Sequence, residues 1–272
     1  MIGIFDSGFG GLTVLSSLLA DLPQYDYLYL GDNARAPYGG RSQEVIYRYT
    51  KEAVDFLFAQ GCVLVILACN TASAQALRRI QTEYLPQKYP GRNVLGVIRP
   101  LAEAAAKNRK CNKIGIIGTR ATIESRAYES ELEKLNPGLE VFSQSAPLLV
   151  PLIEEGWQKR PETKIILKKY LRPLKNKQID SLLLGCTHYS LLYEEIRRII
   201  PKRCEIIRTG EIIADSLQKY LVRHPEYGIK ASANPQRLFF TSDSPERFRD
   251  LAKRFMNIEI KAVKKADLMP SR

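Results

Sequence analysis

Short apolar segments alternate with helical patterns along most of the chain, and this alternation restricts the fold more than any other feature. Continuous apolar runs such as residues 63–67 are typical of strands that are covered on both faces. Repeated strand–helix units predict an α/β protein in which mostly parallel sheets are flanked by helices. The strands are expected at residues 2–5, 27–30, 63–67, 94–97, 113–117 and 181–184.

The helices expected between these strands have recognisable starts and stops. Ser42 is a candidate N-cap for a helix that runs to Gln60, and Gly61 follows it. Proline opens or ends several of the others, because it lacks a backbone donor. The remaining helices are expected to end at Pro23, to span 72–85 before Pro86, to begin at Pro100, to span 123–135 and 161–171, and to end at Pro201.

The two halves of the chain resemble each other. Residues 2–12 (IGIFDSGFGGL) and 114–123 (IGIIGTRATI) both read as a short strand and a small-residue turn that leads into a helix. Residues 64–77 (LVILACNTASAQAL) and 181–192 (SLLLGCTHYSLL) share a strand, a small residue, a cysteine and polar residues. The two pairs are separated by nearly the same length of chain. This pattern predicts two similar α/β domains related by a pseudo-twofold axis.

Cys69 and Cys186 each follow an expected buried strand and precede an expected helix. In an open parallel sheet, ligands bind beyond the carboxyl ends of the strands. A helix N-terminus lowers a thiol pKa from about 8.5 towards neutrality, which suits proton abstraction near neutral pH. We therefore predict that these thiols are the paired acid and base groups of an enzyme that moves a proton on carbon. A free cysteine is more often a small buried hydrophobe, and this is the interpretation for Cys62, Cys111 and Cys204.

Polar residues in the same two turns are candidates for ligand binding. Asn70, Thr71 and Thr187, together with nearby backbone N–H groups, can bind a carboxylate. His188 follows Cys186 by two positions and can activate that thiol or protonate an intermediate. An isolated histidine is more often structural, but this one shares a turn with a cysteine.

Two more turns follow the first two expected strands. The segment Asp6-Ser7-Gly8-Phe9-Gly10-Gly11 lacks both the GxGxxG pattern and the Lys-Ser/Thr pair of phosphate loops, so nucleotide binding is not expected. Asp6 has the position of an acceptor for an ammonium group or of an orienting group for a thiol, and a helix N-cap is the alternative. The turn Pro37-Tyr38-Gly39-Gly40 can clamp a ligand with backbone groups, or it is an ordinary surface turn.

The composition argues against several classes of protein. No apolar stretch of the 272-residue chain approaches a membrane span, and the N-terminal residues do not read as a signal peptide, so a cytoplasmic protein is expected. The five cysteines include no CxxC pair, and only two histidines are present. A disulfide framework, a metal site and a thiol redox function are therefore not favoured.

The charge is basic and uneven. The chain has 41 Lys and Arg against 29 Asp and Glu, a net charge of +12, and most of the excess lies after residue 150. Such a surface can recruit nucleic acid or gather an anionic substrate. The basic residues are scattered among acidic ones, and no helix-turn-helix or zinc-finger pattern is present. A solvated basic surface is the simpler interpretation, and a nucleic-acid-binding protein remains a rival hypothesis.

The sequence resembles the glutamate racemases over roughly residues 2 to 195. The motifs that carry the resemblance occur in the family's order: DSGFGGLTVL, YLGDNARAPYGGRS, ACNTASAQAL, GVIRPLAEAA, GIIGTRATIES, PLIEEGW and LLGCTHYSLL. The GCTHY turn resembles the glutamate enzymes more than the aspartate racemase branch. Two positions depart from the family pattern: Ser190 stands where a proline is usual, and Arg208 where an acidic or small residue precedes Gly.

The resemblance implies two domains that face each other across the active site, one of residues 1–97 plus about 207–272 and one of residues 98–206. It implies racemisation of L- and D-glutamate without pyridoxal phosphate, metal or other cofactor. One thiolate removes the α-proton and the opposite thiol donates one, with Cys69 acting on D-glutamate and Cys186 on L-glutamate. Substrate contacts would come from Asp6, Ser7, Tyr38, Gly39, Asn70, Thr71, Thr187 and His188, and Asp6 and His188 would also assist proton transfer.

The resemblance further implies a bacterial cytosolic protein that supplies D-glutamate for peptidoglycan and forms a homodimer. Within the same scaffold, an aspartate or broad-specificity amino-acid racemase is the first rival. The nucleic-acid-binding protein is the second, and a thiol redox protein is the third.

Overall fold

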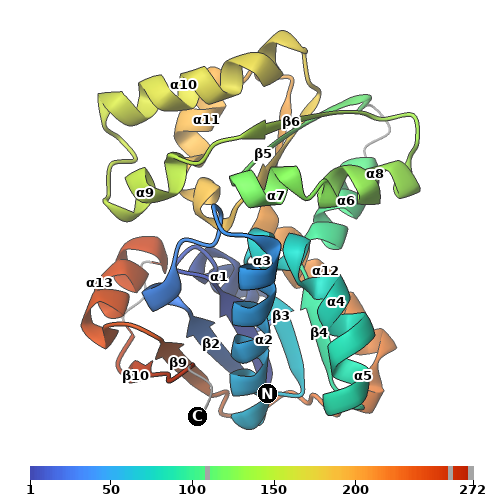
Figure 1. Cartoon of the computed structure of the whole chain (residues 1–272), viewed down its shortest axis with the longest axis vertical. Coiled ribbons are helices and arrows are strands. Elements are labelled where there is room, and N and C mark those ends of the chain that lie inside the picture. Colours follow the sequence, from blue (N-terminus) through green and yellow to red (C-terminus); the bar gives the residue numbers. More distant parts are fainter. Residues whose placement is uncertain (108–110, 257–259, 269–272) are drawn as a thin grey trace.

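Two parallel sheets form the framework of the molecule (Figure 1). The computed structural model describes residues 1–107, 111–256 and 260–268. The larger sheet has six strands in the order β10-β9-β2-β1-β3-β4, and the smaller has four in the order β6-β5-β7-β8. Neighbouring strands pair in parallel in both sheets. The prediction of an α/β fold with parallel sheets flanked by helices is confirmed.

The larger sheet takes strands from both ends of the chain. Its side chains alternate between two hydrophobic clusters, because successive residues of a strand point to opposite faces. In β1, Ile2 and Ile4 join one cluster and Phe5 joins the other. The strands are β1 (Ile2–Asp6), β2 (Tyr27–Gly31), β3 (Leu64–Leu67), β4 (Asn93–Gly96), β9 (Arg237–Thr241) and β10 (Lys264–Lys265).

The smaller sheet is built from the middle of the chain. It consists of β5 (Lys113–Gly118), β6 (Glu140–Ser145), β7 (Ser181–Gly185) and β8 (Glu205–Ile207). The central strands β5 and β7 are almost fully buried, whereas the edge strand β6 is only half-buried. The core residues of β5 and β7 belong to the same hydrophobic cluster as Ile2 and Ile4, so one core runs through both halves.

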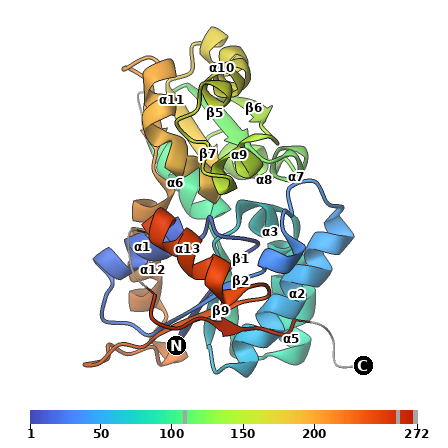
Figure 2. The same ribbon diagram turned by 90° about the vertical axis from the view of Figure 1, so that its left-hand side faces the viewer.

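Helices cover both faces of each sheet (Figures 1 and 2). On the larger sheet, α2 (Gln43–Ala59) packs against β1, β2 and β3, while α1 (Leu12–Asp21) packs against α12 (Thr209–Arg223) and α13 (Pro245–Met256). Around the smaller sheet, α10 (Pro161–Asn176) packs against β6 and α6 (Ile98–Lys107) against β7. The shorter helices are α3 (Asn70–Gln75), α4 (Leu77–Arg79), α5 (Leu85–Lys88), α7 (Arg120–Glu124), α8 (Ala127–Leu135), α9 (Leu149–Glu154) and α11 (Tyr193–Ile199).

Several helix predictions were wrong in detail. The single helix expected at 72–85 is broken at Ala76 and contains a π-helical segment, Ile80–Tyr84. Pro86 does not stop it, because it stands in the first turn of α5, where no N–H is needed. The helix expected at 123–135 is divided by Arg126, whose φ of 53° is left-handed.

Other elements differ in extent or were not foreseen. The basic helix α10 continues past the expected residue 171 and includes Pro173. The strands β6, β8, β9 and β10 were not predicted, and neither were the helices α9, α12 and α13. The residues after Cys186 begin as a 3-10 helix, Thr187–Leu192, rather than an α-helix.

Hydrogen bonds join the two halves near the carboxyl ends of their strands. Ala121 in α7 donates its N–H to the Gly39 carbonyl at 2.9 Å, and its own carbonyl accepts from Gln75 Nε2 at 2.7 Å. The hydroxyl of Thr71 lies 2.9 Å from that of Thr119. These contacts hold the turns of the first half against those of the second.

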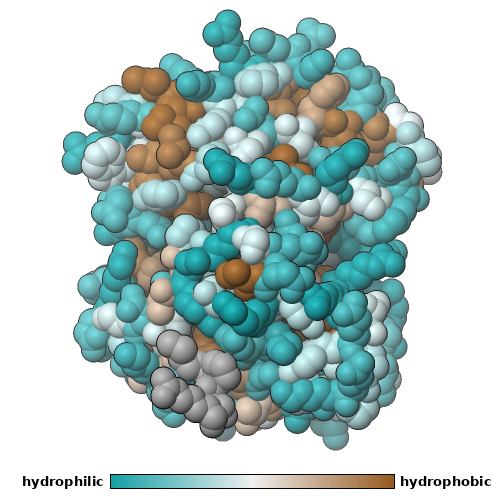
Figure 3. All heavy atoms as spheres, in the orientation of Figure 1, coloured by the Kyte–Doolittle hydropathy of each residue, from teal (hydrophilic) through white to brown (hydrophobic). Residues whose placement is uncertain are grey.

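The face drawn in Figure 3 is mostly hydrophilic, and its hydrophobic side chains gather mainly over the half that holds the smaller sheet. Exposed large apolar residues of that half include Leu148, Trp157 and Ile165. Within the described residues, no helix is long and apolar enough to cross a membrane.

Candidate active site

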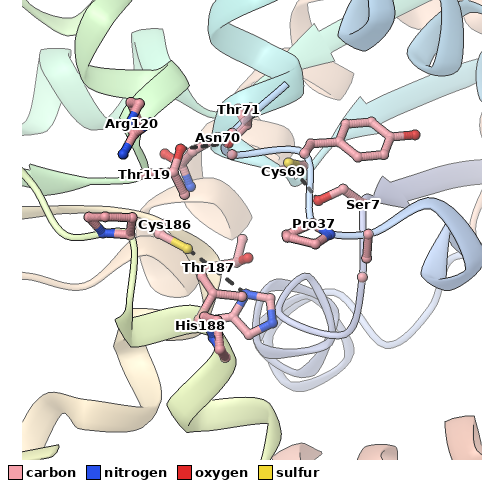
Figure 4. Close-up of a pocket in the computed structure, with 18 of the residues that line it drawn as sticks. Ser7, Pro37, Cys69, Asn70, Thr71, Thr119, Arg120, Cys186, Thr187 and His188 are labelled. Atoms are coloured by element: carbon pink, nitrogen blue, oxygen red, sulfur yellow. Dashed lines mark hydrogen bonds between the residues drawn. The ribbon is translucent and has the colours of Figure 1, made fainter. Parts of the chain in front are cut away.

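A cavity of about 220 Å³ lies between the two halves, at the carboxyl ends of strands from both sheets (Figure 4). This volume is below the roughly 300–1,000 Å³ of sites for drug-sized ligands, so the cavity suits a small metabolite. Of the residues selected from the sequence, those that line it are Ser7, Tyr38, Gly39, Cys69, Asn70, Thr71, Cys186, Thr187 and His188.

Cys69 lines the cavity from the first half, directly after β3. Its sulfur lies 3.2 Å from the Ser7 hydroxyl and accepts the N–H of Ala72 at 3.4 Å, so the thiol caps helix α3. Burial raises the pKa of this thiol to about 12, and the carboxylate of Asp6 adds to the increase. The predicted lowering of the thiol pKa is therefore wrong for Cys69, because desolvation outweighs a helix of only six residues.

Cys186 lines the cavity from the second half, directly after β7. Its sulfur lies 3.9 Å from Nδ1 of His188, and Nε2 of the same ring lies 3.1 Å from Oε1 of Glu154. Burial alone would lower the pKa of His188, but its hydrogen bonds with Cys186 and Glu154 outweigh burial and raise it to about 10. The imidazole is therefore protonated at neutral pH and carries a positive charge next to Cys186.

The two thiols face one cavity from opposite halves of the protein (Figure 4). Both are free and almost fully buried. They are close enough for the charge of Cys186 to raise the pKa of Cys69. An arrangement with one thiol on each side of a small ligand allows proton transfer to and from opposite faces of one carbon.

Asp6 lies behind the cavity wall rather than in it. Its carboxylate accepts the N–H of Gly8 at 2.9 Å and the hydroxyl of Thr187 at 3.4 Å, so it links the turn after β1 to the turn after β7. Burial raises its pKa, and the positive charge of His188 partly offsets this increase.

Polar groups from both halves form a third part of the wall. Asn70 is buried, and its Nδ2 has no hydrogen-bond partner among the described residues. The Thr71 hydroxyl belongs to a cluster with those of Thr119, at 2.9 Å, and Thr122, at 3.2 Å. A buried donor without a protein partner is available to an acceptor in the cavity.

The turn with Tyr38 and Gly39 is held in place from behind. The phenol of Tyr38 donates to the carboxylate of Asp32, which also accepts from Nε of Arg35 at 2.7 Å. A β-carbon at Gly39 would lie 2.7 Å from Cβ of Thr119. Only glycine fits here, so this turn approaches the second half at backbone distance.

Sequence reasoning missed several residues that line the cavity. Glu154, Thr119 and Arg120 do so, together with Pro147, Val150 and Pro151. Glu154 stands in the PLIEEGW motif, and Thr119 and Arg120 stand in GIIGTRATIES, so the signal was present without an assigned role.

The three other cysteines do not line the cavity. Cys62, Cys111 and Cys204 are buried in the hydrophobic clusters, as predicted. Across the part of the chain that the structure describes, no group of three or more His, Cys, Asp or Glu side chains could hold a metal ion.

Comparison with known proteins gives a consistent result. The family model for Asp/Glu/Hydantoin racemase matches residues 13–217. The chain is 41% identical over 259 residues to a glutamate racemase of Chlorobaculum parvum, an alignment that covers 95% of this chain and 93% of the relative.

Solved structures agree in fold and length. A glutamate racemase isoform from Bacillus anthracis superposes with a TM-score of 0.90 at 37% identity, covering 98% of this chain and 97% of the other. A glutamate racemase from Francisella tularensis, solved in complex with D-glutamate, gives a TM-score of 0.89 at 33% identity, with coverage of 98% and 97%.

Proposed function

The chain belongs to the Asp/Glu/hydantoin racemase family, and from this premise we propose that it is a glutamate racemase that interconverts L- and D-glutamate. The observation that carries the proposal is the pair of free thiols, Cys69 and Cys186, on opposite sides of one small cavity. Inversion at carbon requires a proton to leave one face and another to arrive at the opposite face. The relatives named above, and the D-glutamate complex of one of them, favour glutamate as the substrate.

In the proposed reaction, one cysteine acts as a thiolate and the other as a thiol. The thiolate removes the α-proton of glutamate and becomes a thiol, and the opposite thiol gives its proton to the other face of the planar carbanion and becomes a thiolate. Cys69 starts the reaction of D-glutamate and Cys186 that of L-glutamate. No cofactor takes part in this balance of protons.

The high pKa of Cys69 has a consequence for the first step. In the ligand-free protein this thiol stays protonated at neutral pH. A glutamate bound between the thiols brings a positive ammonium group on its α-carbon, and this charge favours the thiolate when it lies nearer the sulfur than the two carboxylates do. A thiolate formed in this way is a strong base, as removal of a weakly acidic α-proton demands.

The remaining polar groups of the cavity fit a substrate with two carboxylates and an ammonium group. Asn70, Thr71 and Thr187 are the proposed contacts for carboxylate oxygens, with Ser7, Tyr38 and Gly39 completing the contacts. His188 delivers or holds a proton beside Cys186, and Glu154 supports it as an ion-pair partner. The carboxylate of Asp6 lies behind the cavity wall and raises the pKa of the Cys69 thiol by its charge.

The wider role that we propose is the supply of D-glutamate for peptidoglycan by a cytoplasmic enzyme that functions as a homodimer. The proposed division into domains assigns residues 1–97 plus about 207–272 to the first domain and residues 98–206 to the second. Each sheet draws its strands from one of these sets.

The direct test is solvent exchange of the substrate α-proton. Purified protein without added cofactor should exchange this proton of L- and D-glutamate for deuterium and racemise either enantiomer. A variant that lacks both thiols, Cys69→Ala with Cys186→Ala, is the blank. The absence of exchange with both enantiomers would refute the proposal, and preferred turnover of aspartate in a substrate panel would favour the first rival.

A further inference from the structure

A buried tyrosine from the second half lies directly behind Asn70. Tyr128 in α8 is 1% exposed, and its hydroxyl donates to Oδ1 of Asn70 at 2.5 Å. Asn70 follows Cys69 in the first half, so this hydrogen bond joins the halves immediately beside the first thiol. A β-carbon at Gly185 would lie 3.3 Å from Cε2 of Tyr128, so the ring also packs against the residue before Cys186.

The hydrogen bond from Tyr128 distinguishes the two ends of the Asn70 amide. A phenol is a better donor than acceptor, and an amide oxygen is a better acceptor than an amide nitrogen. Burial keeps the pKa of Tyr128 well above its usual value, and nearby Cys186 adds to this, so the hydroxyl retains its proton. With Oδ1 occupied, Nδ2 is the end left without a partner among the described residues, in a side chain that lines the cavity.

The orientation of this amide decides what the cavity accepts at this point. With Nδ2 available, the wall offers an N–H donor, which suits a carboxylate oxygen. With the amide turned over, the wall would offer a carbonyl oxygen, which repels a carboxylate and favours an ammonium group. We propose that Tyr128 is a positioning residue that fixes the Asn70 amide with its donor end towards the substrate and thereby makes this part of the cavity a carboxylate site.

This inference rests on the proposed function, since it assigns a role in glutamate binding. It adds a residue outside the cavity lining, because Tyr128 acts only through Asn70. It also explains why an unpartnered donor is buried there. Without Tyr128 the amide could turn over, and part of the population would present the wrong end.

The test is a double-mutant cycle on Tyr128 and Asn70. Tyr128→Phe removes the hydroxyl and keeps the ring, and it should raise KM for both glutamate enantiomers about tenfold, the order expected for one hydrogen bond, with a smaller change in kcat. Asn70→Ala should raise KM at least as much. In the Asn70→Ala background, Tyr128→Phe should change KM no further, and a full additional tenfold increase would overturn the inference.

A matched control separates positioning from general stabilisation. Tyr27 is also 1% exposed and donates its hydroxyl to a backbone carbonyl, that of Leu22, at 3.1 Å. Tyr27→Phe should lower the melting temperature about as much as Tyr128→Phe but leave KM unchanged. If both variants raise KM equally, Tyr128 has only a structural role and the inference fails.

Binding of glutarate, which has two carboxylates and no α-amino group, separates failure of the inference from failure of the proposed function. Calorimetry should show weaker glutarate binding to Tyr128→Phe than to the wild type. If the wild type does not racemise glutamate but this difference remains, the proposed function fails and the carboxylate site stands. Equal glutarate affinity of both proteins, or no binding to either, overturns the carboxylate site.

Discussion

The surroundings of the two thiols differ although each thiol directly follows a buried strand. Cys69 has a hydroxyl, a backbone N–H and the carboxylate of Asp6 around it. Cys186 has a protonated imidazole that is itself paired with Glu154. On the Cys69 side, only hydrogen bonds stabilise a thiolate. On the Cys186 side, the protonated imidazole of His188 provides a cation that can also transfer a proton.

This difference shows that two thiols placed at the ends of buried strands have different electrostatic surroundings. In the proposed mechanism both thiols act in both charge states, so the two directions meet different barriers at different steps. Changes on the Cys186 side should move the alkaline limb of the pH profile, whereas changes on the Cys69 side should alter the rate without moving that limb.

The largest effect is expected from removing either thiol. Cys69→Ala and Cys186→Ala should each reduce racemisation by about 10⁴-fold, since general acid–base groups contribute up to that order. Each variant should retain slow α-proton exchange with one enantiomer only, and with opposite preference: Cys69→Ala with L-glutamate and Cys186→Ala with D-glutamate.

Exchange kinetics in deuterated solvent, followed by NMR for each enantiomer, measure this prediction. Cys204→Ala, which removes a buried thiol away from the cavity, should turn over normally. Near-normal racemisation by either single variant would contradict the two-thiol mechanism. The same enantiomer preference in both variants would remove the distinction between the two sides.

Protonation of His188 should also make the free energy of unfolding depend on pH. Its pKa is raised to about 10 in the folded protein, against about 6.5 when unfolded. The stabilisation is therefore complete below about pH 6.5 and is lost as the pH rises through 10, and at 1.36 kcal/mol per pKa unit it is on the order of 5 kcal/mol.

Denaturant unfolding of the wild type and of His188→Gln, from pH 6 to pH 10, measures this contribution. The difference in the free energy of unfolding between the two proteins should shrink towards pH 10. A difference that stays constant with pH would mean that His188 is neutral in the folded protein.

Glu154→Gln should act on the Cys186 side alone. Loss of the carboxylate removes one of the two hydrogen bonds that raise the pKa of His188, so the alkaline limb of the kcat profile should move to lower pH. We expect kcat to fall about 100-fold near pH 8. The measurement is the pH profile of kcat for Glu154→Gln. The control is the same profile for Glu155→Gln, which alters the exposed neighbouring residue.

Ser7→Ala is expected to have the smallest effect and to act on the Cys69 side alone. The variant loses the hydroxyl that lowers the pKa of the Cys69 thiol, so the thiolate becomes harder to form. We expect kcat/KM to fall about tenfold, the order of one hydrogen bond to a charged group, with no shift of the alkaline limb. Ser16→Ala in α1 is the control, and a shifted limb in Ser7→Ala would contradict the separation of the two sides.

The sequence predicted the central strands well because their residues are apolar on both faces. β1, β3 and β7 are buried along their whole length, and short apolar runs of that kind have few structural alternatives to a buried strand. β6 escaped prediction because an edge strand keeps polar side chains such as Ser143 and Gln144. Its assignment depends on pairing with β5, which only the folded chain provides.

The sequence predicted the site residues that follow the ends of strands. It did not predict the site contacts between segments that are far apart in the chain. Cys69 and Cys186 follow strands, so their place in a parallel sheet could be inferred. The partnership of Glu154 with His188 joins α9 to the turn after β7, and no local pattern in either segment encodes it. The pKa of Cys69 was misjudged for the same reason, since burial depends on the whole fold.

The main-chain link at Ala121 gives the molecule an internal reporter. Both polar backbone groups of this residue are bonded to the first half, through Gly39 and Gln75. Both groups belong to the main chain of residue 121, and the amide proton there becomes exposed when the two halves separate. Hydrogen–deuterium exchange at this amide would therefore count how often the cavity opens in the free protein, and how far a bound substrate slows that opening.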